Sequence, residues 1–207
     1  KQDTAGRKSL FMPVNRSVPD VAQKRKDWNG LISGFKASDL VFLDESGCNT
    51  DMTRRYAYSL GGSRAVDSAP LSKPKNTTIL SSIQLDGTLR YTTFSGGTTV
   101  ERFKRYLETD LLPHLNGNSV LIMDNMKSHH AKAVRNLLDS SGVRYIYLPP
   151  YSPDLNPIEK LWSKVKAFLR KFKARTLDAL PNAIQNAFHS VTVSDCSGWF
   201  RFCGHAL

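Results

Sequence analysis

Three acidic side chains occupy positions in the sequence at which they could bind a metal ion. Asp44 and Asp124 each close an apolar run, residues 40–43 and 119–123, of the kind that forms a buried parallel strand. Glu159 stands at the start of a helical pattern. The carboxyl ends of parallel strands gather at the edge of a sheet where ligands bind, so these acids can converge. Carboxylate oxygens suit Mg²⁺ or Mn²⁺, which also take water and phosphate oxygens as ligands.

Each acid also has a purely structural interpretation. Residues 156–159, Asn-Pro-Ile-Glu, match the pattern of a capping box, which alone would explain a glutamate at position 159. Asp44 and Asp124 could each mark an exposed strand end or a turn. Taken together, the three acids favour a metal site, because clustered carboxylates repel one another unless they share cations.

The charge of the chain indicates a polyanionic partner. Its 207 residues carry 29 Lys and Arg against 18 Asp and Glu, a formal net charge of +11. This excess is far larger than solubility needs, and its sign attracts phosphate backbones, so nucleic acid is the leading partner class. No segment has 18 uninterrupted apolar residues and no signal-peptide pattern follows Lys1, so we expect no membrane association.

The three cysteines have no paired spacing, so a disulfide framework is not expected. Cys196, Cys203 and His205 could suggest zinc, but the six-residue gap between the cysteines and the missing fourth ligand argue against it. Ordinary helix packing is the favoured interpretation of these residues.

The hydrophobic patterns predict an α/β domain. Strands are expected at residues 40–44, 78–84, 89–94, 119–124 and 143–148, and helices at about 99–112, 130–140 and 157–173. A short aromatic strand is also expected around residues 56–58. The Asp-Gly pair at residues 86–87 predicts an antiparallel hairpin of the strands on either side of it. The predicted order of the core is β-β-β-α-β-α-β-α.

We expect one core domain with an appendage at each end. The predicted parts are a basic arm or linker at residues 1–38, a core at residues 39–175, and helices packed on the core at residues 176–207. The arm contains a helical candidate that opens at Pro19, and the last part contains candidates at about 177–190 and 195–203. Because the chain starts with Lys1 rather than Met, we expect it to be part of a longer protein.

Two basic segments are candidate DNA contacts. They are the glycine-broken residues 47–77 and the helix at 157–173, which has no acid after Glu159. Like charges along a helix repel one another, so a phosphate partner would explain them, although a solvated surface is the alternative. The candidate residues are Arg54, Arg55, Lys73, Lys75, Lys160, Lys164, Arg170 and Lys171.

Three motifs carry a resemblance to a known family. They are Leu-Asp-Glu-Ser-Gly at residues 43–47, Asp124-Asn125 with His129, and Tyr-Leu-Pro-Pro-Tyr-Ser-Pro-Asp-Leu-Asn-Pro-Ile-Glu at residues 147–159. With these motifs, residues 20–205 resemble the DDE catalytic domain of the mariner-type transposase superfamily, in its bacterial insertion-sequence branch. The proline-rich motif and the 34 residues between Asp124 and Glu159 are the most specific elements of this resemblance.

The resemblance implies a fold and a set of site residues. The implied fold is a ribonuclease-H-like α/β fold, with a mixed five-stranded sheet of three antiparallel and two parallel strands flanked by helices. Asp44, Asp124 and Glu159 would hold two Mg²⁺ or Mn²⁺ ions that activate a water or a DNA 3′-hydroxyl and stabilise the leaving oxygen, with Asp44 as the bridging ligand. Asn125 and His129 are second-tier candidates that orient ligands or phosphate, although His129 could equally be a capping or packing residue. His130 is left unassigned.

The implied function is cut-and-paste transposition. A DDE transposase cleaves double-stranded DNA at transposon ends and joins the freed ends to target DNA, here as a homodimer in the bacterial cytoplasm near the nucleoid. Family members usually carry helix-turn-helix modules ahead of this domain, and residues 1–38 are too short for one, so this chain alone should bind DNA with little sequence preference. The alternatives are a non-catalytic DNA-binding remnant and a ribonuclease-H-like nuclease that acts on RNA–DNA hybrids. The charge disfavours a glycosidase with paired carboxylates.

Overall fold

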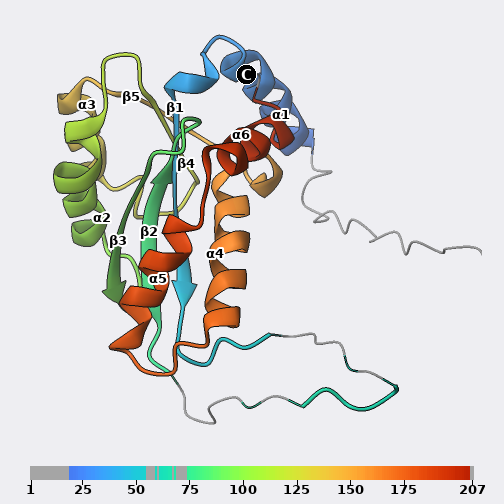
Figure 1. Cartoon of the computed structure of the whole chain (residues 1–207). Coiled ribbons are helices and arrows are strands. Elements are labelled where there is room, and N and C mark those ends of the chain that lie inside the picture. The colour runs from blue at the N-terminus through green and yellow to red at the C-terminus, as the bar shows by residue number, and fades with distance from the viewer. Residues whose placement is uncertain (1–18, 55–58, 60, 67, 69–73, 206–207) are drawn as a thin grey trace, which may run out of the picture.

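A mixed five-stranded sheet forms the centre of the molecule. The computed structural model describes residues 19–54, 59, 61–66, 68 and 74–205, and the sheet has the strand order β3-β2-β1-β4-β5 (Figure 1). The strands are β1 (Leu40–Cys48), β2 (Thr77–Ile83), β3 (Leu89–Ser95), β4 (Val120–Met123) and β5 (Arg144–Tyr147). β2 pairs antiparallel with β1 and β3, whereas β4 pairs parallel with β1 and β5. The predicted mixed sheet is confirmed.

Helices cover both faces of the sheet. One face is covered by α2 (Val100–Tyr106) and α3 (Lys132–Ser141), the other by α4 (Ile158–Phe172), α5 (Ala179–His189) and α6 (Val193–Phe202) (Figure 1). Successive residues of a strand point to opposite faces. In β1, Leu43 accordingly lies in the apolar cluster beneath α2 and α3, whereas Phe42 lies in the cluster beneath α4. The same alternation separates the side chains of Asp44 and Glu45.

Helix α1 (Pro19–Ile32) packs on this core. Trp28 is 3% exposed and belongs to the apolar cluster on the α4 side of the sheet. Arg25 forms a 2.6 Å ion pair with Asp154 and also donates a hydrogen bond to the Ser152 hydroxyl. α1 is therefore joined to the proline-rich loop that leads into α4. The division of the chain at residues 38 and 175 stays a prediction.

The helices follow the predicted order, with one change of form. The helix expected over 99–112 is α2 followed by a π-helical segment (Leu107–Leu111) and a 3₁₀ turn (Leu112–His114). The turn contains Pro113, which has no N–H with which to continue an α-helical ladder. The strand predicted around residues 56–58 lies outside the described residues. None of the described helices is long and apolar enough to cross a membrane.

Cys196, Cys203 and His205 are packed against the core. Each is 4% exposed or less, and the His205 ring lies 4.8 Å from the Phe42 ring, centroid to centroid. Burial raises the pKa of both thiols to about 11, which disfavours the thiolate form that zinc needs. This burial agrees with the helix-packing interpretation of the three residues.

Candidate active site

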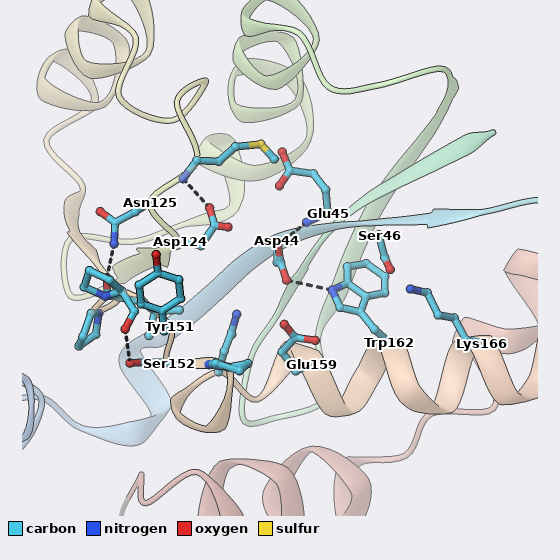
Figure 2. A pocket seen from close by; sticks show the side chains of 16 residues that line it. Asp44, Glu45, Ser46, Asp124, Asn125, Tyr151, Ser152, Glu159, Trp162 and Lys166 are labelled. Carbon is cyan, nitrogen blue, oxygen red and sulfur yellow. Dashed lines mark hydrogen bonds between the residues drawn. The ribbon is translucent and has the colours of Figure 1, made fainter. Parts of the chain in front are cut away.

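The three predicted acids line one pocket. It has a volume of about 730 Å³ and lies beyond the end of β4, next to the start of α4 (Figure 2). β1 and β4 pair in parallel through Leu43 and Met123, so the residues that follow, Asp44 and Asp124, are neighbours. Glu159 enters the pocket from the first turn of α4. The fold thus brings together acids from two strands and one helix.

Asp44 does not end a strand, as the sequence predicted, but lies within β1. The strand continues to Cys48 because β2 goes on pairing with it, whereas β4 stops at Met123. Beyond that point β1 has no neighbouring strand on the β4 side among the described residues, and the pocket opens there. Asp44 Oδ1 accepts a 2.7 Å hydrogen bond from the Glu45 N–H, and Oδ2 accepts one of 3.2 Å from Trp162 Nε1.

The pocket disfavours the ionised form of two of its acids. Burial is the main cause that raises the pKa of Asp44 to about 7; the Glu45 N–H opposes it, and the charges of Asp124 and Glu159 add to it. Burial also raises the pKa of Glu159, although the positive charge of Lys166 lowers it in part. A cation bound beside these carboxyls would lower their pKa values and favour the ionised form.

Asp124 is held by a histidine. His129 Nδ1 lies 2.9 Å from Asp124 Oδ1, which also accepts a 3.0 Å hydrogen bond from the Met126 N–H. Burial raises the pKa of Asp124, but these hydrogen bonds outweigh it and lower the pKa below its ordinary value. Burial lowers the pKa of His129, but hydrogen bonds to Asp124 and Glu45 outweigh it and raise the pKa to about 10. At neutral pH, Asp124 is therefore ionised and His129 is protonated.

The donor atoms of the pocket fit Mg²⁺ or Mn²⁺. The three acids offer carboxylate oxygens, and a bound cation would offset both the burial and the neighbouring negative charges that raise the pKa of Asp44. Across the described part of the chain, no three His, Cys, Asp or Glu side chains form a group that could hold a single ion. A Mg²⁺ site commonly uses one or two carboxylates and completes its shell with water and substrate phosphate, so the pocket suits an ion that is shared with DNA.

Glu159 does not cap its own helix. Its N–H donates to the Asn156 carbonyl at 3.1 Å, but α4 begins after Pro157 without a side-chain cap. Within the described residues, the buried Asn156 Oδ1 has no hydrogen-bond partner. The capping-box interpretation of residues 156–159 is therefore wrong, and the Glu159 carboxylate remains available to the pocket.

Asn125 joins the ends of β4 and β5. Its Nδ2 donates to the Leu148 carbonyl, and its Oδ1 lies 3.2 Å from His130 Nε2. The His130 ring in turn stacks on Tyr147, with ring centroids 4.1 Å apart. These contacts tie the segment that carries Asp124 to the start of the proline-rich loop.

The predicted DNA contacts differ in their surroundings. Lys164 forms a 2.5 Å ion pair with Asp195, and Lys160 Nζ lies 3.8 Å from the centre of the Phe202 ring. Of the others, Arg54, Lys75 and Lys171 are exposed, Arg170 is partly exposed, and Arg55 and Lys73 lie outside the described residues. The charge of Lys164 is thus already balanced within the protein, whereas the exposed cations face solvent.

Three residues of the pocket were not predicted from the sequence. Lys166 lies two helical turns after Glu159 on the same face of α4, a spacing that could have identified it. Trp162 contacts Asp44, which is 118 residues away, and no periodicity signals such a contact. Tyr151 is 53% exposed and has a φ of 55°, in the left-handed region that residues other than glycine rarely adopt.

A model of the DDE superfamily endonuclease family matches residues 39–181 of the chain. The chain belongs to this family. Its similarity extends to the transposase of the transposable element Tc1 from Caenorhabditis elegans, which is 30% identical over 97 residues. The matched region covers 45% of this chain and 36% of the Tc1 transposase.

Solved structures of Mos1 transposase share the fold of this DDE chain. A pre-cleavage Mos1 transpososome superposes with a TM-score of 0.79 at 19% identity, covering 99% of this chain and 65% of the Mos1 chain. The catalytic domain of Mos1 mariner transposase superposes with a TM-score of 0.68 at 17% identity, covering 89% of each chain. This chain therefore corresponds to part of the length of these transposases, and its described residues include the fold of their catalytic domain.

Proposed function

We propose that this chain is the catalytic domain of a DNA transposase, which cleaves DNA strands and joins them to target DNA in a metal-dependent reaction. The observation that carries the proposal is the pocket in which Asp44, Asp124 and Glu159 meet. Burial and the charges of Asp124 and Glu159 disfavour the ionised form of Asp44, which a cation would favour, and the chain as a whole carries a net charge of +11. Such a combination suits a cation and a polyanion bound together. Membership of the DDE superfamily endonuclease family supports the same chemistry.

Asp44, Asp124 and Glu159 would hold two Mg²⁺ or Mn²⁺ ions, with Asp44 contributing to both. Bound ions of this kind activate the attacking oxygen and stabilise the leaving oxygen of phosphoryl transfer. The protein's own part is to fix the acids: Trp162 holds Asp44, and His129 holds Asp124. Mos1 paired-end complexes solved with Mn and with Mg support the choice of metal.

Other side chains of the pocket would receive the DNA. Lys166 brings a positive charge beside Glu159, where a phosphate of the scissile strand can lie. Tyr151 presents an exposed aromatic ring, on which a base can stack whatever its sequence. The exposed Arg54, Lys75 and Lys171 would extend the contact along the phosphate backbone without reading sequence.

The biological setting forms part of the proposal. The chain would act on double-stranded DNA at transposon ends, as a homodimer, in the bacterial cytoplasm near the nucleoid. The Mos1 paired-end and strand transfer complexes support DNA ends as the partner. The proline-rich motif at residues 147–159 supports the bacterial insertion-sequence branch.

A DNA-nicking and strand-joining assay with Mn²⁺ tests the proposal. The wild-type chain should nick duplex DNA, and Asp44→Asn and Glu159→Gln should each remove that activity without unfolding the protein. Glu108→Gln is the matched control, because it removes an exposed carboxylate that pairs only with Lys104 on α2 among the described residues. It should keep full activity.

Three results would contradict the assignment. Full activity in Asp44→Asn would show that Asp44 is not a catalytic residue. DNA binding by the wild type without metal dependence or cleavage would indicate a non-catalytic remnant. Faster cleavage of RNA–DNA hybrids than of duplex DNA would indicate a ribonuclease-H-like nuclease.

A further inference from the structure

Glu45 is a buried carboxylate that leaves β1 on the face opposite Asp44. The two residues are consecutive in the strand, and their side chains diverge from it (Figure 2). The Glu45 side chain is 6% exposed, and its neighbour across the β1–β2 pair is Leu80, in the apolar cluster beneath α2 and α3. Because a buried charge is costly unless it is paired, the partner of Glu45 indicates what the residue does.

That partner is His129, which also contacts Asp124. His129 Nε2 lies 3.1 Å from Glu45 Oε1, and Nδ1 lies 2.9 Å from Asp124 Oδ1. The His129 side chain is fully buried. Since an ionised carboxylate only accepts hydrogen bonds, the ring donates at both nitrogens. One imidazole thus bridges a carboxylate of β1 and a carboxylate of the pocket.

The rest of the structure leaves the His129 ring little freedom. The ring stacks on Phe103, with centroids 4.2 Å apart and an angle of 27° between the planes. The His129 carbonyl accepts a 3.1 Å hydrogen bond from the Tyr147 hydroxyl, and its N–H donates to the Met126 carbonyl at 3.0 Å. These contacts fix the backbone and one face of the ring. Nδ1 also lies 3.3 Å from the Asp124 carbonyl oxygen, and the contact of Nε2 with Glu45 holds the opposite edge of the ring, with Nδ1 toward Asp124.

We infer that Glu45 is a positioning residue that sets the orientation of Asp124 through His129. This inference rests on the proposed function, in which Asp124 is a ligand of a divalent metal ion. The consecutive acids of β1 then have different roles. Asp44 faces the other two acids directly, whereas Glu45, on the other face of the sheet, orients Asp124 through His129. Removing a residue that orients a metal ligand typically lowers metal affinity by about 10- to 100-fold.

The geometry separates this role from two simpler ones. One is that of a direct metal ligand, since Glu45 lines the pocket together with Asp44, and its Oε2 has no hydrogen-bond partner among the described residues. Its side chain nevertheless leaves β1 on the face opposite Asp44, where Oε1 contacts His129 Nε2, so its closest polar partner is the histidine and not the other two acids. A purely structural Glu45–His129 pair would not involve the pocket, whereas His129 Nδ1 is bonded to Asp124. The contact chain therefore connects the buried acid to the pocket.

Calorimetric titration with Mn²⁺ tests the inference on the metal-free chain. The proteins are the wild type, Asp124→Ala, Glu45→Ala, His129→Asn and the double variant Glu45→Ala/His129→Asn. Glu108→Gln serves as the control for loss of a carboxylate elsewhere, and circular dichroism checks that each protein is folded. We expect Glu45→Ala to bind Mn²⁺ about 10- to 100-fold more weakly than the wild type. Because Glu45 acts through His129, the double variant should bind no more weakly than His129→Asn.

Equal Mn²⁺ affinity in the wild type and folded Glu45→Ala would overturn the inference. Additive losses in the double variant would also overturn it, because they would show that Glu45 acts on the metal without His129. Should Glu45→Ala not fold, Glu45→Met replaces it throughout, since methionine nearly keeps the volume and lacks the carboxylate oxygen that contacts His129. Failure of the proposed function gives a different result, namely Mn²⁺ binding that is absent in the wild type or unchanged in Asp124→Ala.

Discussion

Replacing Asp44 with Asn should stabilise the metal-free protein at alkaline pH, although it removes a proposed metal ligand. The pKa of an ordinary Asp carboxyl is 3.8, and that of Asp44 is raised to about 7, mainly by burial. Below about pH 3.8 the carboxyl is protonated in both the folded and the unfolded chain, so it does not affect unfolding. Above about pH 7 it is ionised in both, and the full cost of the buried charge is present.

The expected size of the effect follows from these two pKa values. At about 1.4 kcal/mol for each pKa unit, the ionised Asp44 lowers the free energy of unfolding by about 4 kcal/mol above pH 7. Asn is neutral at every pH and nearly the same size. As the pH rises from 4 to 8, the free energy of unfolding of the variant should therefore increase by about 4 kcal/mol relative to that of the wild type. Most of this increase should occur below pH 7. Urea unfolding of both proteins in EDTA, at several pH values in this range, measures the difference.

Asp124→Asn is the matched control, because it should behave in the opposite way. The pKa of Asp124 is lowered by its hydrogen bonds to His129 and the Met126 N–H, so its charge stabilises the fold above the ordinary pKa. This variant should be less stable than the wild type at neutral pH, and the difference should shrink as the pH falls. A stability difference for Asp44→Asn that does not change with pH, or a variant less stable than the wild type at pH 8, would show that burial of the Asp44 charge does not destabilise the fold.

Three further predictions concern the pocket and its surroundings. Lys166→Gln should flatten the salt dependence of DNA binding, by about 0.9 in the log–log slope for the lost phosphate contact, whereas Lys164→Gln should change it less because Lys164 pairs with Asp195. Tyr151→Gly should be at least as stable as the wild type in thermal unfolding, since glycine accepts a positive φ, yet cleave DNA more slowly. Arg25→Ala should lower the free energy of unfolding by about 1 kcal/mol in urea titrations, because the ion pair with Asp154 is partly exposed.

Each of these predictions has a result that would contradict it. Equal salt slopes for Lys166→Gln and the wild type would show that Lys166 does not contact phosphate. Marked destabilisation by Tyr151→Gly would show that the contacts of the Tyr151 ring stabilise the fold. A cleavage rate equal to that of the wild type would show that the ring does not contact DNA. Unchanged stability in Arg25→Ala would show that α1 is held to the proline-rich loop by its apolar contacts alone.

The strands and the acids could be predicted because their signals are local. An apolar run closed by an acid marks both Asp44 and Asp124, and the helical stripe after Glu159 marks α4. The end of β1 could not be predicted, because it depends on how far β2 pairs with it. The contact of His129 with Glu45 could not be predicted either, since the two are 84 residues apart and only the completed sheet brings them together.

The lysines of α4 also have contacts that could not be predicted from the sequence. The pattern of lysines along this helix predicts a cationic face, but it does not tell which of them the fold neutralises. Lys164 forms an ion pair with Asp195, a residue of α6, whereas Lys166 lines the acidic pocket. The capping interpretation of Glu159 fails for a similar reason, because the buried Asn156 side chain does not reach the start of the helix as a cap.

Anomalous diffraction from a crystal soaked in Mn²⁺ tests whether Asp44, Asp124 and Glu159 form a metal site. We predict Mn²⁺ density in the pocket, within bonding distance of Asp44 and of Asp124 or Glu159, and its loss in Asp44→Asn crystals. Mn²⁺ bound only elsewhere on the protein, or a pocket that stays without Mn²⁺ at saturating concentration with DNA present, would contradict the claim that these acids form a metal-dependent catalytic site.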